Sequence, residues 1–347
     1  MKRIPSLDGF RAVSILLVLF CHSRLSSGFP SQLVVVAKQG EVGVTIFFVI
    51  SGFLITHLLM TEESKNGNIN IGAFYIRRVL RIIPVYVLYL LFILLWRNFE
   101  SMGVNRGNII HALTFTVNFD SQKNWFLGHF WSVSVEEQFY LFWPAFVILF
   151  RKNLKVILCL LIAYSCLARV IAFKFAALEL VTLSPFFEYA GAVFIGALGG
   201  IIFFEQPQIL KHSIFRSSLA QLTALAIFVM FVYFTENGKL ALISLPFGNV
   251  IISLSVLFLI FAYVTPSHQF MFKILNHKAV VHIGVLSYSI YIWQQFFFVG
   301  AITGWWRAFP YNLTVIYIVS LGSYYFWERP FLKLKKRFTP RKLALVV

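Results

Sequence analysis

Ten apolar runs of roughly 20 residues constrain this sequence more than any other feature. They lie near residues 7–23, 42–60, 79–96, 130–150, 154–174, 185–204, 217–234, 247–264, 283–301 and 311–328. A helix needs about 20 mostly apolar residues to cross the hydrocarbon core of a bilayer. We therefore expect an all-α polytopic membrane protein: a bundle of about ten transmembrane helices that forms a single domain over residues 1–347, with no fused soluble domain.

The composition agrees with a bilayer environment. Only 12% of the residues are charged and 59% are hydrophobic, whereas soluble domains carry about 25% charged residues, so a soluble globular enzyme is excluded. The first run contains Asp8 and Arg11 and lacks a small-residue cleavage site, which argues against a cleaved signal peptide. Residues 97–129 are too polar to span the membrane unaided, so we expect a short re-entrant or surface element there.

The excess of basic residues predicts the orientation. Thirty Lys and Arg against thirteen Asp and Glu give a net charge of +17. With a cytoplasmic N-terminus, about 20 of the basic residues lie in cytoplasmic segments and about eight on the other side, as the positive-inside rule requires. Both termini are then cytoplasmic, with a basic tail at about 335–347. Because these charges lie at the membrane surface, nucleic-acid binding is a poor interpretation.

The first polar group inside an apolar run comprises Asp8, Arg11 and His22. The eleven residues from Arg11 to His22 amount to three helical turns plus about 20°, so both side chains share one helix face about 16 Å apart along the axis. Asp8 can pair with Arg11 across one turn. The arrangement is consistent with a functional site. It is also consistent with an arginine that snorkels to the headgroups and a histidine that caps the helix.

A second group gathers Arg77, Arg78 and Arg81 on neighbouring turns. Three guanidinium groups at a membrane surface suit a polyphosphate, because arginine binds phosphate through two parallel hydrogen bonds. The alternative is an anchor for anionic lipid headgroups. Pro84 is expected to bend the helix just beyond the cluster.

Two further polar groups lie in later runs. Ser132, Glu136 and Tyr140 recur every four residues and form a stripe on one helix face, which predicts a polar cavity, a partner for His22 or Arg11, or a purely structural ion pair. Tyr288 and Tyr291 share a face with Gln295, and bind either a ligand or a neighbouring helix. The three cysteines and the other histidines show no metal-ligand spacing, so we expect no metal site.

Six segments, in order, resemble the acyltransferase 3 family of membrane O-acyltransferases. They are residues 4–11 with His22 eleven positions after Arg11, residues 47–55, the cluster of residues 77–84, residues 131–144, residues 287–293 and residues 327–331. The resemblance covers residues 4 to about 334.

The resemblance implies transfer of an acyl group, usually acetyl, from acyl-CoA to a hydroxyl of a carbohydrate such as O-antigen, capsule, peptidoglycan or exopolysaccharide. It implies His22 as general base, Arg11 as a partner in the donor site, and Glu136 as the group that orients or charge-tunes the histidine. Arg77, Arg78 and Arg81 would hold the phosphates of coenzyme A. Asp8, Ser132, Tyr140, Tyr288 and Tyr291 would support the site. Acetyl-CoA would be a co-substrate with no tightly bound cofactor, and the location a bacterial inner membrane.

Two departures from the family pattern stand out. Gln294 occupies a position where many relatives carry histidine, and no hydrolase-like domain follows the last run, so acceptor capture is expected from the membrane part. The main alternative function is a transporter that exports a sugar or glycolipid and uses buried Arg, His and Glu as a proton relay. The paired halves typical of transporters are not found.

Overall fold

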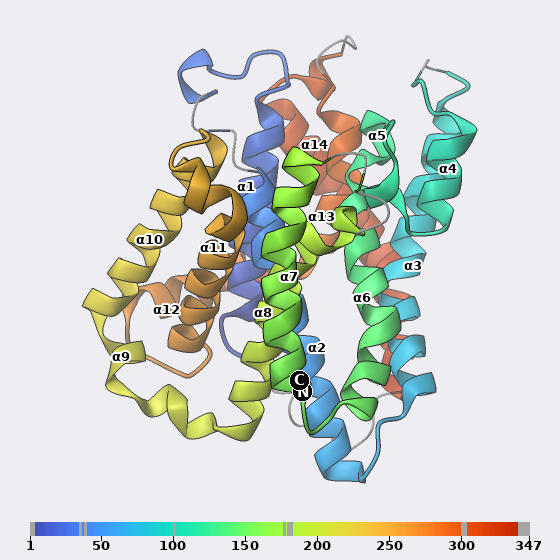
Figure 1. The fold of residues 1–347 in the computed structure, drawn as a ribbon. Coiled ribbons are helices and arrows are strands. Elements are labelled where there is room, and N and C mark those ends of the chain that lie inside the picture. Colours follow the sequence, from blue (N-terminus) through green and yellow to red (C-terminus); the bar gives the residue numbers. More distant parts are fainter. Residues whose placement is uncertain are drawn as a thin grey trace.

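The computed structural model describes residues 4–34, 37, 40–99, 102–175, 178, 183–299 and 304–338. Throughout these ranges the regular structure is helical, with no β-strand. Figure 1 shows the long helices standing side by side as a bundle. We call the end of the bundle where α1 begins and α15 ends the termini face, and the other end the opposite face. Residues 339–347, most of the predicted basic tail, lie outside the described residues.

Each predicted apolar run overlaps one main helix, although the helix in the run 311–328 has only 12 residues. These helices are α1 (Leu7–Ser23), α2 (Gly40–Asn66), α3 (Ile71–Trp96), α6 (Phe130–Leu149), α7 (Leu154–Lys174), α8 (Ser184–Glu205), α10 (Ser218–Glu236), α11 (Ala241–Tyr263), α13 (Lys278–Phe297) and α14 (Tyr311–Gly322). After α14 the chain forms a π-helical segment, Ser323–Glu328, and then α15 (Arg329–Lys335). The short helices are α4 (Arg106–Leu113), α5 (Trp125–Gly128), α9 (Ser213–Arg216) and α12 (Phe270–Leu275).

Six of these helices, α2, α3, α7, α8, α10 and α11, are long and apolar enough to cross a membrane. The protein is therefore a multi-pass membrane protein. Helices α1, α6 and α13 carry the polar side chains singled out above, and α14 has only 12 residues. Ten spans and cytoplasmic termini remain predictions.

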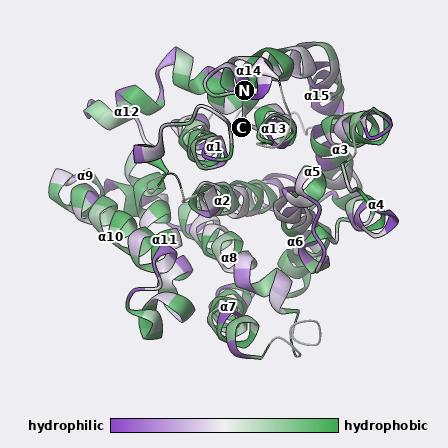
Figure 2. Ribbon diagram, turned by 90° about the horizontal axis from the view of Figure 1, so that it is seen from above, coloured by the Kyte–Doolittle hydropathy of each residue, from purple (hydrophilic) through white to green (hydrophobic). Residues whose placement is uncertain are grey.

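Helix α2 occupies the middle of the bundle. Seen from above, it lies between α1 and α13 on one side and α8 and α7 on the other (Figure 2). Two glycines allow α2 and α8 to approach closely, because a Cβ on Gly52 would overlap the Val193 carbonyl and one on Gly196 would overlap the Val49 carbonyl. Small residues at such crossings are typical of membrane helices.

The outer helices present apolar side chains to their surroundings. On α7 and α10 only 17% of the most apolar stretch is buried, against 78% on α2. Exposed leucines such as Leu160 and Leu222 are 64% and 63% accessible. An apolar exterior around a packed centre is the arrangement expected for a bundle that faces lipid.

Within 97–129, the described residues 97–99 and 102–129 include short helices near the opposite face, as Figure 1 shows for α4 and α5. Asn105 and Asn108 form a reciprocal capping box at the start of α4, and Asn108 also donates to Asp120 at 2.8 Å. Trp125 of α5 donates to the Gln295 carbonyl at 3.1 Å, and the Gln295 amide donates back to the Trp125 carbonyl at 2.8 Å. These bonds fix α5 against α13.

Helix α3 runs through Pro84 without interruption. Tyr288 of α13 donates to the Ile82 carbonyl at 2.8 Å, and Trp327 donates to the Pro84 carbonyl at 2.8 Å. The carbonyl that a proline at position 84 leaves without its helical donor is that of Leu80, four residues earlier. The two side-chain bonds to Ile82 and Pro84 instead tie α13 and the segment after α14 to α3.

Candidate active site

Three cavities follow one another from the termini face to the opposite face. The inner cavity lies at the start of α1, the central cavity lies between α1, α2, α3, α6 and α13, and the outer cavity lies at the end of α1. Their volumes are about 440, 80 and 580 Å³. The inner and central cavities share Arg11, Leu54, Arg78 and Arg81 as lining residues, and the central and outer cavities share Val44 and Tyr291. The central cavity is thus a narrow waist between two wider spaces.

The inner cavity is strongly cationic. Its lining includes five basic residues, Arg11, Arg78, Arg81, Lys335 and Lys336, and two acidic residues, Asp8 and Glu328. Arg11 pairs with Asp8 at 2.9 Å, which confirms the predicted pair across one turn of α1. The buried Glu328 accepts a hydrogen bond from Ser289 at 2.7 Å. The basic groups outnumber the acidic ones in this inner cavity, a balance that suits an anionic ligand.

Arg78 stands at the boundary between the inner and central cavities. Its guanidinium lies over the rings of Phe74 at 5.6 Å and Tyr140 at 5.5 Å. The residue is only 9% exposed, and its Nε has no hydrogen-bond partner in the described part of the chain. A buried, ring-stacked guanidinium with an unsatisfied donor is suited to an acceptor oxygen from a ligand.

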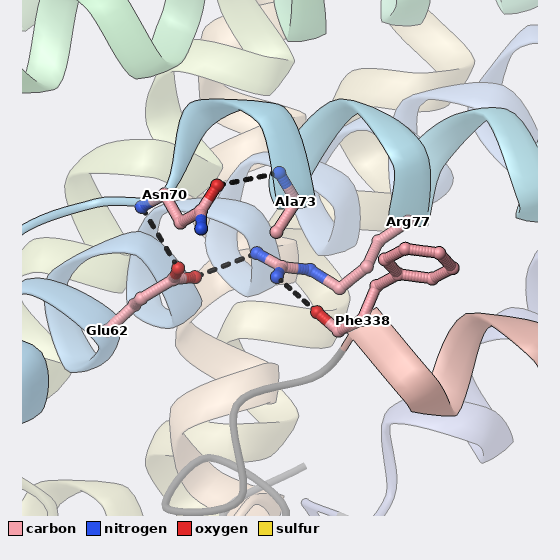
Figure 3. Close-up of polar contacts among 5 residues, drawn as sticks. All are labelled: Glu62, Asn70, Ala73, Arg77 and Phe338. Atoms are coloured by element: carbon pink, nitrogen blue, oxygen red, sulfur yellow. Dashed lines mark hydrogen bonds and ion pairs between the residues drawn. The ribbon is translucent and has the colours of Figure 1, made fainter.

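Arg77 does not join this cluster, which corrects the prediction of three clustered arginines. Figure 3 shows it turned toward α2, where it forms an ion pair with Glu62 at 2.7 Å and donates to the Phe338 carbonyl at 3.0 Å. The Asn70 backbone N–H also donates to Glu62, at 3.1 Å. The Glu62 side chain is 1% exposed. Arg77 therefore neutralises a buried carboxylate and lines neither the inner nor the central cavity.

The stripe on α6 faces the central cavity. Ser132, Glu136 and Tyr140 all line it. Tyr140 is hydrogen-bonded to Ser51 of α2, which lines the same cavity. Arg11 and Arg81 line this cavity as well. Of the two partners predicted for Glu136, Arg11 therefore shares its cavity, whereas His22 lines the outer cavity.

His22 lines the outer cavity and is oriented by α13. Its Nδ1 lies 2.7 Å from the Gln294 Oε1. Since an amide oxygen only accepts, Nδ1 carries the hydrogen and Nε2 keeps a lone pair. The Gln294 Nε2 donates to the Gln295 Oε1 at 3.4 Å, in agreement with this amide orientation. The hydrogen bond that orients His22 thus comes from Gln294, and charge-tuning of His22 by Glu136 stays a prediction.

Tyr288 and Tyr291 both bind neighbouring helices, which confirms one of the two predicted uses, whereas binding of a ligand stays a prediction. Each hydrogen-bonds a neighbouring helix, Tyr288 to the Ile82 carbonyl and Tyr291 to the His129 carbonyl at 2.9 Å. Tyr291 is also hydrogen-bonded to Ser132 at 2.6 Å. Both tyrosines line the central cavity. Their hydroxyls therefore hold α3, α6 and α13 around the waist.

The structure adds three residues that sequence reasoning did not place in the site: Gln294 beside His22, His129 in the outer cavity and Lys335 in the inner cavity. His129 directly precedes the stripe on α6, and this polar residue at the start of an apolar helix is the signal that could have found it. In the described part of the chain no three His, Cys, Asp or Glu side chains are arranged to hold a metal ion.

Comparison with known proteins places this site in context. Residues 4–327 match the sequence model of the acyltransferase 3 family, which describes an acyltransferase domain. The chain is 29% identical to the peptidoglycan O-acetyltransferase OatA of Listeria monocytogenes, over 84% of this chain and 49% of the relative. It is 28% identical to a putative O-acetyltransferase of Staphylococcus aureus strain COL, over 96% and 58%. It is 27% identical to the putative peptidoglycan O-acetyltransferase YrhL of Bacillus subtilis, over 84% and 48%.

The chain spans about half the length of these curated relatives. No solved structure matches it. The family match nonetheless extends over nearly the whole sequence and includes every cavity-lining residue of α1, α2, α3, α6 and α13. The chain belongs to the acyltransferase 3 family of membrane acyltransferases.

Proposed function

We propose that the protein is an O-acetyltransferase that takes an acetyl group from acetyl-CoA at the termini face and transfers it to a carbohydrate hydroxyl at the opposite face. One observation carries the proposal: a cationic cavity at one end of the bundle and a histidine-lined cavity at the other end both share lining residues with the small central cavity between them. The O-acetyltransferase names of the relatives support the reaction type, and a glycan such as peptidoglycan is the acceptor class. The location is the cytoplasmic membrane of a bacterium.

The donor would bind with its phosphates in the inner cavity. Coenzyme A carries a diphosphate and a 3′-phosphate, and Arg78, Arg81 and Lys335 supply cations for them. The unbranched pantetheine arm is the most slender part of the donor and would be the part that enters the central cavity, the smallest of the three. The thioester would then lie beyond Arg81, on the side toward His22.

The chemistry requires one base. The acceptor hydroxyl oxygen attacks the thioester carbonyl carbon, its proton passes to the His22 Nε2, the C–S bond breaks and the proton is then returned to the coenzyme A thiolate. A sugar hydroxyl is a weak nucleophile that needs such a base, and histidine is the usual one near neutral pH. Since the thioester is already activated, we expect direct transfer without an acyl-enzyme.

The first test uses purified full-length protein with acetyl-CoA labelled in the acetyl group and glycan strands prepared from de-O-acetylated peptidoglycan. Label in base-labile esters of the glycan, with none bound stably to protein, is the expected result. Stable protein-bound label in the absence of glycan would overturn direct transfer. Failure of any glycan acetylation would overturn the proposed function and favour a transporter.

Arg81→Gln is expected to raise the KM for acetyl-CoA about tenfold or more. A charge-assisted hydrogen bond contributes about 1.5–3 kcal/mol, and about 1.4 kcal/mol corresponds to a factor of ten. Arg77→Gln should leave this KM unchanged, although it strands the buried Glu62 and lowers thermal stability. Initial rates at varied acetyl-CoA check both variants. An equal rise in the KM for acetyl-CoA in Arg77→Gln would show that Arg77 contributes to donor binding, as the prediction of three clustered arginines requires.

Gln294→Leu is expected to lower kcat about tenfold, because loss of the amide oxygen frees His22 to adopt the other tautomer and other ring orientations. Gln294→Glu keeps an oxygen acceptor and should retain more activity than Gln294→Leu. Steady-state rates at saturating donor and acceptor check the order. Equal loss in both variants would show that the hydrogen bond to Nδ1 is unimportant.

A further inference from the structure

His129 is a buried histidine that the proposed reaction does not use. It lines the outer cavity together with His22 and is only 4% exposed. The rings of Tyr89 and Tyr291 lie 5.4 and 5.6 Å from its imidazole, and its backbone carbonyl accepts from the Tyr291 hydroxyl at 2.9 Å. These contacts hold the imidazole in one orientation.

The hydrogen bonding of this imidazole is one-sided. Its Nε2 lies 3.1 Å from the Ile292 carbonyl oxygen, which can only accept, so Nε2 carries the hydrogen. In the neutral ring Nδ1 then has a lone pair and accepts. Nδ1 is buried and has no hydrogen-bond partner within the ranges that the structure describes. Buried acceptors are rarely left unsatisfied, because each costs about 1–3 kcal/mol.

The outer cavity has the chemistry of a sugar site. At about 580 Å³ it is the widest of the three along the bundle, and Trp125 and Trp131 line it beside the two histidines. Flat indole faces suit the apolar faces of pyranose rings, and Arg24, Glu41 and Lys123 supply polar groups toward the opposite face. A sugar brings several hydroxyl donors, and one of them would satisfy Nδ1.

We propose that the outer cavity is the acceptor subsite and that the His129 Nδ1 accepts a hydrogen bond from a second hydroxyl of the same sugar whose reacting hydroxyl gives its proton to His22. This inference rests on the proposed function and adds to it the residue that positions the acceptor. Because the Nε2 edge of His129 faces α13, Nδ1 is the edge of the ring that remains for a ligand. The sugar is thereby held at two points.

Two substitutions separate this role from a structural one. Asparagine can place its amide oxygen near the position of Nδ1, whereas glutamine can place its amide nitrogen near Nε2 and keep the bond to the Ile292 carbonyl. We expect His129→Gln to raise the KM for glycan strands about tenfold or more, the equivalent of about 1.4 kcal/mol. The KM of His129→Asn for glycan strands should stay within about threefold of the wild-type value. The KM for acetyl-CoA should be unchanged in both.

The measurement is acetyl transfer to varied glycan strands by purified full-length variants, with thermal denaturation of each variant in parallel. KM does not depend on the folded fraction, so partial unfolding does not obscure it. A structural role predicts the reverse order, with His129→Gln the better substitute, and would overturn the inference. Unchanged acceptor KM in both variants would also overturn it and leave the proposed function intact. No transfer by the wild type would refute the proposed function itself.

Discussion

His22→Asn is expected to lower acetyl transfer by a factor of about 10²–10⁴, the usual contribution of a general base. Asparagine keeps a donor near the position of Nδ1 and so retains the contact with Gln294, but it has no group at the position of Nε2. The outer cavity and the packing of α1 against α13 should therefore persist. The measurement is the rate of transfer from labelled acetyl-CoA to glycan strands at matched amounts of folded protein.

The control for this variant is His268→Ala. His268 is exposed and lines none of the three cavities along the bundle, so full activity is expected. The KM for acetyl-CoA should also be unaffected in His22→Asn, because the phosphates would bind at the other end of the bundle. Activity of His22→Asn within a few-fold of the wild type would exclude His22 as the base and direct attention to Glu136.

Gly52→Ala is expected to destabilise the whole bundle. The added methyl would overlap the Val193 carbonyl, a backbone group that cannot rotate away, so α2 and α8 must separate. Overpacking typically costs about 1–3 kcal/mol and occasionally more. We expect the midpoint of thermal denaturation to fall by about 5 °C or more. Because α2 lines all three cavities, we expect acetyl-transfer activity to fall together with the denaturation midpoint.

Gly322→Ala adds the same methyl group where no atom outside its own helix backbone and its chain neighbours lies within 4 Å, and serves as the matched control. Its denaturation midpoint should equal or exceed that of the wild type, since alanine favours helix over glycine. Equal midpoints for Gly52→Ala and the wild type would show that the α2–α8 crossing tolerates a side chain.

Hydropathy was enough to predict the long helices because apolar runs and helices coincide in a chain that must satisfy its backbone within the membrane. Hydropathy did not predict how the run 311–328 is divided: α14 ends at Gly322, and a π-helical segment continues to Glu328. Local pairs were also predictable. Asp8 and Arg11 are three residues apart on one helix, so their ion pair needs no knowledge of the fold.

Contacts between distant helices were not predictable. Arg77 is on the same helix as Arg78 and Arg81, yet Glu62 of the neighbouring helix draws it away from them. Gln294 lies 272 residues from His22, and no spacing rule links an amide on one helix to an imidazole on another. The sequence therefore identified the chemical groups, whereas the packing of α2, α6 and α13 determined which of them meet.

The measurement that tests the account most directly is sidedness of transfer in proteoliposomes of known orientation. Acetyl-CoA cannot cross a bilayer because of its phosphates, so donor and glycan can be confined to opposite compartments. We predict acetylation only when acetyl-CoA is at the termini face, where Arg78 and Arg81 lie, and the glycan is at the opposite face, where His22 lies. Equal transfer from acetyl-CoA supplied at the opposite face would contradict it.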